Sequence, residues 1–189
     1  MSEKLKYDFF FIRGDQFADN VVHMENLDEM PKHTATVLVD MYTDLWKFEK
    51  DFYGDLIPPR MYTRVGELVC VVNKPNFFFE FIYRYTDDGM KEMIGYMMFE
   101  RWIERTPDNK ETVHHYDIKQ LYISPDYRRK GIATTAVQKF IETIRRWSAT
   151  ATVMTSIDVH KKNQIAMSFY RKIGYRDYSE TLAEKFPAE

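Results

Sequence analysis

The sequence is poor in cysteine, which excludes several classes of protein at once. Cys70 is the single cysteine among 189 residues, so no disulfide can form within the chain, and a reducing compartment is the simpler expectation. Cysteine pairs of the kind that bind zinc are missing, and the five histidines are isolated except for His114-His115. Because neighbouring residues of a strand point to opposite faces, this pair would not share a metal, and no metal site is expected.

Long hydrophobic runs are missing as well. No apolar stretch approaches the roughly 18 residues that a membrane-spanning helix needs, and the opening MSEKLKYD lacks the apolar core of a signal peptide. We therefore expect a cytoplasmic protein with no membrane partner. The length, with 44% apolar and 30% charged residues, predicts a single globular domain over residues 1–189.

The net charge of −2 is small but unevenly distributed. Residues 113–189 hold 13 Lys and Arg against 8 Asp and Glu, whereas residues 1–112 hold 14 against 21. The basic part suits a polyanionic small ligand, and the acidic part suits a cationic one. Nucleic acid is not an expected partner, because the overall charge is negative and the sequence carries no RNA- or DNA-binding motif.

The order of predicted elements indicates an α+β protein with a mixed sheet. In the first part of the chain, strand patterns cover residues 7–13, 67–73, 76–85 and 93–103, and helical patterns cover 16–30 and 34–53. Asp87-Asp88-Gly89 is a hairpin turn signal between the third and fourth of these strands. The second part predicts a strand at 114–123, a helix at 132–147, a strand at 153–159, a helix over 165–173 ended by Gly174, and closing strands within 175–185.

The most informative segment is LYISPDYRRKGIAT, residues 121–134. A strand ends at Pro125, three cations follow at Arg128, Arg129 and Lys130, and a helix begins directly after Gly131. Unpaired N–H groups at a helix N-terminus form an anion site, and a glycine there lets a phosphate approach the backbone. The alternative is an ordinary strand–helix turn with solvated basic residues. Neither of the common nucleotide-binding fingerprints, GxxxxGK[ST] or GxGxxG, has this spacing.

Two separated motifs of this chain resemble those of the GNAT superfamily of N-acetyltransferases. RRKGIA (residues 128–133) is similar to its (Q/R)-x-x-G-x-(G/A) signature, and residues 121–125 are similar to the strand end that precedes it. Further on, Asn163, Ala166, Tyr170 and Gly174 resemble the family's N-x-x-A-x-x-x-Y-x-x-x-G segment. The resemblance covers roughly residues 66–180. It implies a GNAT-like mixed β-sheet flanked by helices, with a splayed parallel strand pair that binds the cofactor.

The resemblance also implies an activity: transfer of an acetyl group from acetyl-CoA (coenzyme A as acyl donor) to a primary amine, which attacks directly within a ternary complex. Main-chain groups of strand 114–123 would pair with pantetheine, and those of the following loop would hold the pyrophosphate. The cofactor-binding residues implied are Leu121, Tyr122, Ile123, Arg128, Arg129, Lys130, Gly131, Ile132, Ala133, Thr134, Asn163 and Tyr170. Asn163 has an alternative role as a helix N-cap, and one residue can serve both.

Two residues carry the implied catalysis. Tyr170 matches the tyrosine that protonates the leaving thiolate, since a phenol keeps its proton at neutral pH; alternatively, it is a core residue. Asp117 lies four residues before Leu121, where some relatives carry a glutamate base. Its alternatives are a water chain, a solvated strand carboxylate with no role, and the weaker candidates His115 and Glu100.

The acceptor stays open among a small amine, an antibiotic amine and a protein or peptide amine. Asp40, Asp44 and Asp51 share one face of the helix over 34–53 and either line a slot for a cationic amine or form a solvated face. Homodimerisation is also left open. The alternative function is a non-catalytic GNAT-fold protein that binds acetyl-CoA and acts through a protein partner, because a fold does not establish an activity.

Overall fold

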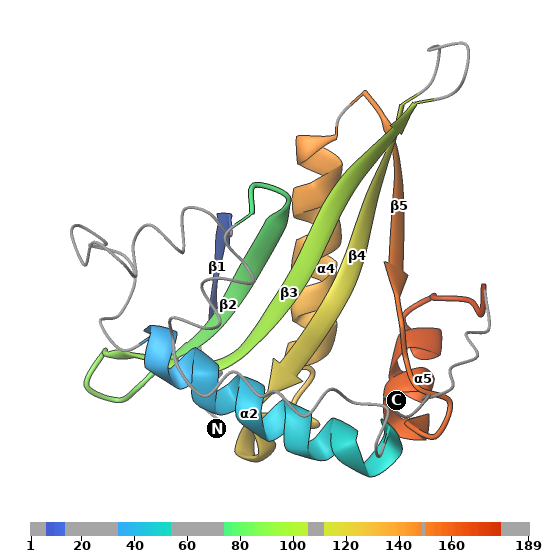
Figure 1. The fold of residues 1–189 in the computed structure, drawn as a ribbon. Coiled ribbons are helices and arrows are strands. Elements are labelled where there is room, and N and C mark those ends of the chain that lie inside the picture. The colour runs from blue at the N-terminus through green and yellow to red at the C-terminus, as the bar shows by residue number, and fades with distance from the viewer. Residues whose placement is uncertain (1–6, 14–33, 54–73, 106–111, 149, 179–189) are drawn as a thin grey trace, which may run out of the picture.

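A mixed five-stranded sheet forms the centre of the molecule (Figure 1). The computed structural model describes residues 7–13, 34–53, 74–105, 112–148 and 150–178. The strands lie in chain order across the sheet: β1 (Tyr7–Arg13), β2 (Phe77–Tyr85), β3 (Lys91–Arg105), β4 (Thr112–Ile123) and β5 (Thr152–Ile157). Neighbouring strands are antiparallel except β4 and β5, which are parallel. The predicted α+β fold with a mixed sheet is confirmed.

Helices cover both faces of this sheet (Figure 1). On one face lies α2 (Thr34–Tyr53), whose buried Leu38 and Met41 belong to a core cluster with Phe79 and Phe81 of β2. On the other face lies α4 (Ile132–Trp147), whose Val137, Phe140 and Ile144 pack with residues of β3 and β4. The short α5 (Gln164–Lys172) adds the partly buried Phe169 to this second cluster. Because β2 is covered on both sides, its sequence FFFEFIYRY is apolar on both faces.

The predicted elements agree closely with the observed ones. The helices over 34–53 and 132–147 are confirmed at both ends, and the strand bounds differ by a few residues at most. Gly89 and Gly174 have φ of 80° and 104°, which suits the predicted turn and helix end. Residues 175–178 form no strand, and the remaining part of the predicted closing strands lies outside the described residues. The predicted helix over 16–30 and strand over 67–73 lie outside them too.

The parallel pair of strands separates before β4 ends. Pairing of β4 with β5 runs from Val113 opposite Thr152 to Ile118 opposite Ile157, where β5 ends. β4 continues for five more residues, 119–123, whose pairing in the described part of the chain is with β3. The splayed parallel pair that the resemblance implies is thus present. In residues 119–123 of β4, the edge that faces away from β3 is open among the described residues.

A β-bulge lies at the point of separation. In the β3–β4 register, Phe99 is opposite Ile118 and Met98 is opposite Gln120, so Lys119 is the extra residue. The bulge shifts the alternation of side chains along β4. Before it, Ile118 packs in the cluster under α4, whereas after it Tyr122 packs in the cluster under α2.

Candidate functional site

The loop between β4 and α4 has a backbone suited to binding an anion. A single 3₁₀ turn, η2 (Pro125–Tyr127), follows the strand. Arg129 and Gly131 then adopt positive φ of 61° and 80°, and such residues turn main-chain N–H groups into a concavity that attracts anions. Gly131 is the N-cap of α4 and provides no side-chain hydrogen bond to the first turn. The N–H groups at the start of α4 therefore remain available to a ligand.

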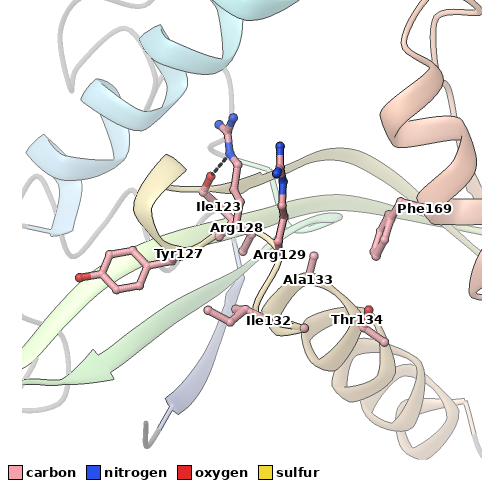
Figure 2. Close-up of a pocket in the computed structure, with 9 residues that line it drawn as sticks. Ile123, Tyr127, Arg128, Arg129, Ile132, Ala133, Thr134 and Phe169 are labelled. Carbon is pink, nitrogen blue, oxygen red and sulfur yellow. Dashed lines mark hydrogen bonds between the residues drawn. The ribbon is translucent and has the colours of Figure 1, made fainter. Parts of the chain in front are cut away.

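A pocket of about 170 Å³ opens beside this helix N-terminus (Figure 2). Its wall is formed by the end of β4, the loop, the first turn of α4 and one residue of α5. The lining residues are Ile123, Tyr127, Arg128, Arg129, Gly131, Ile132, Ala133, Thr134 and Phe169. Figure 2 shows Phe169 reaching from α5 toward the side on which Ala133 and Thr134 lie. The pocket thus joins two segments that are separated by more than 30 residues in the sequence.

Two of the three loop cations contact the loop and strand around them. The Nε of Arg128 donates to the carbonyl of Ile123 at 2.8 Å (Figure 2), and its guanidinium carbon lies 5.6 Å from the ring centre of Tyr122. The ammonium of Lys130 lies 5.1 Å from the ring centre of Tyr127. These contacts shape the loop, while all three charges stay exposed near the pocket.

The open edge of β4 presents main-chain groups of two predicted cofactor residues. The N–H of Ser124 donates to Ile94 of β3 at 2.9 Å. Because main-chain groups of successive strand residues point to opposite edges, those of Ile123 and Leu121 point away from β3, toward the gap that β5 has left. Arg128 bonds the carbonyl of Ile123 on that side.

The backbone of Tyr122 is turned the other way. Its carbonyl lies so close to Gly95 of β3 that a Cβ at that glycine would be 2.5 Å from the oxygen. Its hydroxyl donates to Asp44 of α2 at 3.4 Å. Burial and then the neighbouring Asp44 raise the pKa of the Tyr122 phenol. Among the three acidic residues singled out on this helix, Asp44 therefore has a contact with the end of β4.

Asn163 is the N-cap that precedes α5, and Tyr170 lies in the last turn of this helix. The Oδ1 of Asn163 accepts from the N–H of Ala166 at 3.1 Å, so the proposed N-cap role is realised. Tyr170 is buried, with ring centres 4.9 Å from Phe169 and 5.5 Å from Tyr175. Burial and then Tyr175 raise the pKa of its phenol. Tyr170 does not line the pocket, but its neighbour Phe169 does.

Asp117 lies outside this pocket, on the sheet face that α2 partly covers. It stands one residue before the end of the β4–β5 ladder, opposite Glu100 of β3 and Ser156 of β5. Its side chain is 29% exposed. The weaker base candidates are near it: Glu100 accepts from Asn76 at 2.7 Å and pairs with Lys119 at 3.3 Å.

The two adjacent histidines of β4 point to opposite faces, as predicted. The Nδ1 of His114 lies 2.6 Å from the Ser148 hydroxyl at the end of α4, whereas the ring of His115 stacks on Trp102 on the other face. Within the residues that the structure describes, no cluster of three acidic, histidine or cysteine side chains could hold a metal ion. No described helix combines the length and apolarity required to cross a membrane.

The sequence did not single out two of the pocket residues, Tyr127 and Phe169. Tyr127 lies inside the loop motif, between Asp126 and Arg128, and Phe169 directly precedes the motif tyrosine. Aromatic residues next to the motif positions were the available signal. Which of them faces the pocket depends on how η2 and α5 are oriented, and the sequence does not specify this.

Comparisons with known proteins agree with the fold. The fold is shared with a tetramutant of the BH1408 protein from Bacillus halodurans (TM-score 0.66, 11% identity, covering 95% of this chain and 99% of that one). It is also shared with the aminoglycoside acetyltransferase meta-AAC0020 from an uncultured soil metagenomic sample, in complex with trehalose (TM-score 0.59, 9% identity, 97% of each chain). A third similar structure is the aminoglycoside N-acetyltransferase AAC(6')-Iy in complex with CoA (TM-score 0.55, 10% identity, 100% of this chain and 99% of that one). Among curated proteins none matches significantly. The model of the Acetyltransferase (GNAT) family matches residues 38–175. This chain therefore belongs to the GNAT family of acetyltransferases.

Proposed function

We propose that this protein is an N-acetyltransferase that transfers an acetyl group from acetyl-CoA to a primary amine within a ternary complex. The observation that carries the proposal is the pocket at the N-terminus of α4, which adjoins the open edge of β4. The single cysteine is consistent with action in the cytoplasm. Membership of the family and the shared fold support an acyl-transfer reaction.

The residues present fit a coenzyme A group. The positive φ of Arg129 and Gly131 and the helix N-terminus suit a pyrophosphate. A Cβ built at Gly131 meets no atom within 4 Å, so this position faces open space. The open edge at Leu121 and Ile123 suits an amide-bearing arm such as pantetheine, which would add to the sheet as a further strand does.

Each proposed catalytic residue has a definite task. When bound, acetyl-CoA supplies the thioester that the amine attacks. Tyr170 would give its phenolic proton to the leaving sulfur, since a phenol is protonated at neutral pH. Asp117, or a water chain, would take the proton of the acceptor nitrogen. Main-chain groups at Leu121 would polarise the thioester carbonyl.

Binding of the donor is tested by calorimetric titration with acetyl-CoA. We expect micromolar binding by the wild-type protein and loss of binding in Gly131→Asp, since a carboxylate there repels the pyrophosphate. Gly131→Asn is the matched control: asparagine has the same size and also tolerates positive φ, but it is neutral. If folded wild-type protein shows no binding, or if both variants bind as the wild type does, the proposed donor site is wrong.

Catalysis is tested with a panel of amines that includes polyamines, aminoglycosides and lysine peptides. For an accepted amine, we expect both Tyr170→Phe and Asp117→Ala to lower the rate. If Tyr170 is the general acid, Tyr170→Phe should lower the rate by about 10²- to 10⁴-fold. Both variants should still bind acetyl-CoA. If the protein binds acetyl-CoA yet acetylates no amine, the alternative of a non-catalytic protein that acts through a partner is favoured. Unchanged turnover in both variants would contradict the assigned roles.

A further inference from the structure

Asp117 is surrounded by hydrogen-bond donors from three different strands. The hydroxyl of Ser156 on β5 donates to its Oδ1. The indole N–H of Trp102 on β3 donates to its Oδ2 at 3.3 Å. The ammonium of Lys119, the bulge residue of β4, lies 3.6 Å from the same Oδ2. Each carboxylate oxygen therefore has at least one donor.

The donors are themselves held in place. The ring of Trp102 stacks on His115 with centres 3.5 Å apart and planes at 3°, and the Nε2 of His115 lies 3.0 Å from the Glu104 carboxylate. Ser156 is fixed by strand pairing directly opposite Asp117. It occupies the position before the last pair of the β4–β5 ladder, so the contact lies at the edge of the gap where the strands separate.

We propose that Ser156 and Trp102 are positioning residues for Asp117 in acetyl transfer. The proposal rests on the proposed function above, and it adds which residues orient Asp117 toward the acceptor nitrogen. A carboxylate has about four lone-pair directions, and the donors from β3, β4 and β5 occupy part of them. The Asp117 side chain is 29% exposed, so it can be reached from solvent, and there it receives the proton of the acceptor ammonium as the neutral amine is released for attack. Ser156 and Trp102 fix the direction of this carboxylate.

The strands around Asp117 carry four further charged or titratable side chains near it. Glu100 and Glu104 stand on β3, while His115 and Lys119 stand on β4. The sequence of β5, TVMTSI, contains no titratable side chain. Substitutions at Ser156 and Trp102 leave all of these charges unchanged. A change in turnover of these variants therefore reports on the two hydrogen bonds and not on an altered charge.

The test compares variants that remove one donor each. Ser156→Ala and Trp102→Phe should each lower kcat by about three- to tenfold, the worth of one hydrogen bond, and should leave the KM for acetyl-CoA unchanged. Phenylalanine keeps an aromatic ring against His115. Ser156→Thr keeps the hydroxyl and should restore wild-type behaviour. Thr152→Ala, an exposed position on the same strand and face, is the matched control and should have no effect.

Two further readouts separate this inference from the proposed function. In an Asp117→Asn background, Ser156→Ala should cause no additional loss, because coupled residues are not additive. Calorimetric titration with acetyl-CoA needs no turnover, and Ser156→Ala and Trp102→Phe should both bind acetyl-CoA as the wild type does. A wild-type protein without acetyl-CoA binding would refute the proposed function, whatever the variants do. An active enzyme whose Ser156→Ala and Trp102→Phe variants keep the wild-type kcat would overturn the positioning role.

Discussion

At the residue scale, the most unusual side chain is Glu80 in the middle of β2. It is fully buried, and neither carboxylate oxygen has a hydrogen-bond partner among the described residues. Burial raises its pKa to about 9, although Lys139 acts in the opposite direction. Glu80 is therefore protonated in the folded protein at neutral pH, when the unfolded chain would be ionised at this position.

This difference makes stability depend on pH. Since the folded pKa lies above the unfolded value of 4.5, the contribution of Glu80 is fully present below that value and is lost as the pH rises toward about 9. The side chain of Glu80→Gln cannot ionise. The free energy of unfolding of this variant relative to that of the wild type should therefore increase by up to about 1.4 kcal/mol for each pH unit in this window. Urea unfolding at pH 5 and pH 8 measures it.

The exposed Glu142 of α4 provides the control for Glu80. Glu142→Gln should follow the wild-type stability at both pH values. A Glu80→Gln variant that also follows the wild type would show that the buried carboxyl is ionised or has found a partner.

At the scale of the secondary-structure element, α5 depends on its N-cap residue. Asn163 caps the helix through Oδ1, and its amide N–H groups are not part of the cap. Asn163→Ala should destabilise the protein by about 1 kcal/mol through loss of the cap. Asn163→Ser keeps a capping oxygen and should be nearly as stable as the wild type, yet it should bind acetyl-CoA more weakly, because the amide donors are gone.

The comparison separates the two roles of Asn163. Urea unfolding reports the cap, and calorimetric titration with acetyl-CoA reports the ligand contact. Full affinity in a stable Asn163→Ser variant would leave Asn163 with the structural role only.

At the scale of the whole molecule, the proposed donor site joins segments from β4, α4 and α5. A ligand that binds only the folded chain stabilises it as a whole, by about 2.7 kcal/mol at a concentration of 100 Kd. For a chain of this length, we expect acetyl-CoA at that concentration to raise Tm by about 5–10 °C. Thermal unfolding with and without acetyl-CoA measures the shift. Gly131→Asp should unfold at the same temperature in both conditions.

Local sequence was sufficient for most of the elements because each has a short-range cause. Leu38, Met41 and Leu45 recur at helical spacing, and the aromatic run of β2 favours a strand. The anion-binding loop was predictable for the same reason: a glycine that adopts positive φ and the helix that follows it are adjacent in sequence. The two family motifs, which the family match over residues 38–175 supports, are also local patterns.

The tertiary structure decided what depends on contacts between distant residues. It ended the β4–β5 ladder at Ile118, placed the bulge at Lys119 and brought Phe169 to the pocket. It also left Asp117 on the sheet face opposite α4, among donors from β3 and β5 that no motif contains. Register and strand length follow from the packing of whole faces and edges rather than from the preferences of single residues. For this reason the sequence by itself determined the family and the loop, whereas the surroundings of each proposed catalytic residue were set by the folded sheet.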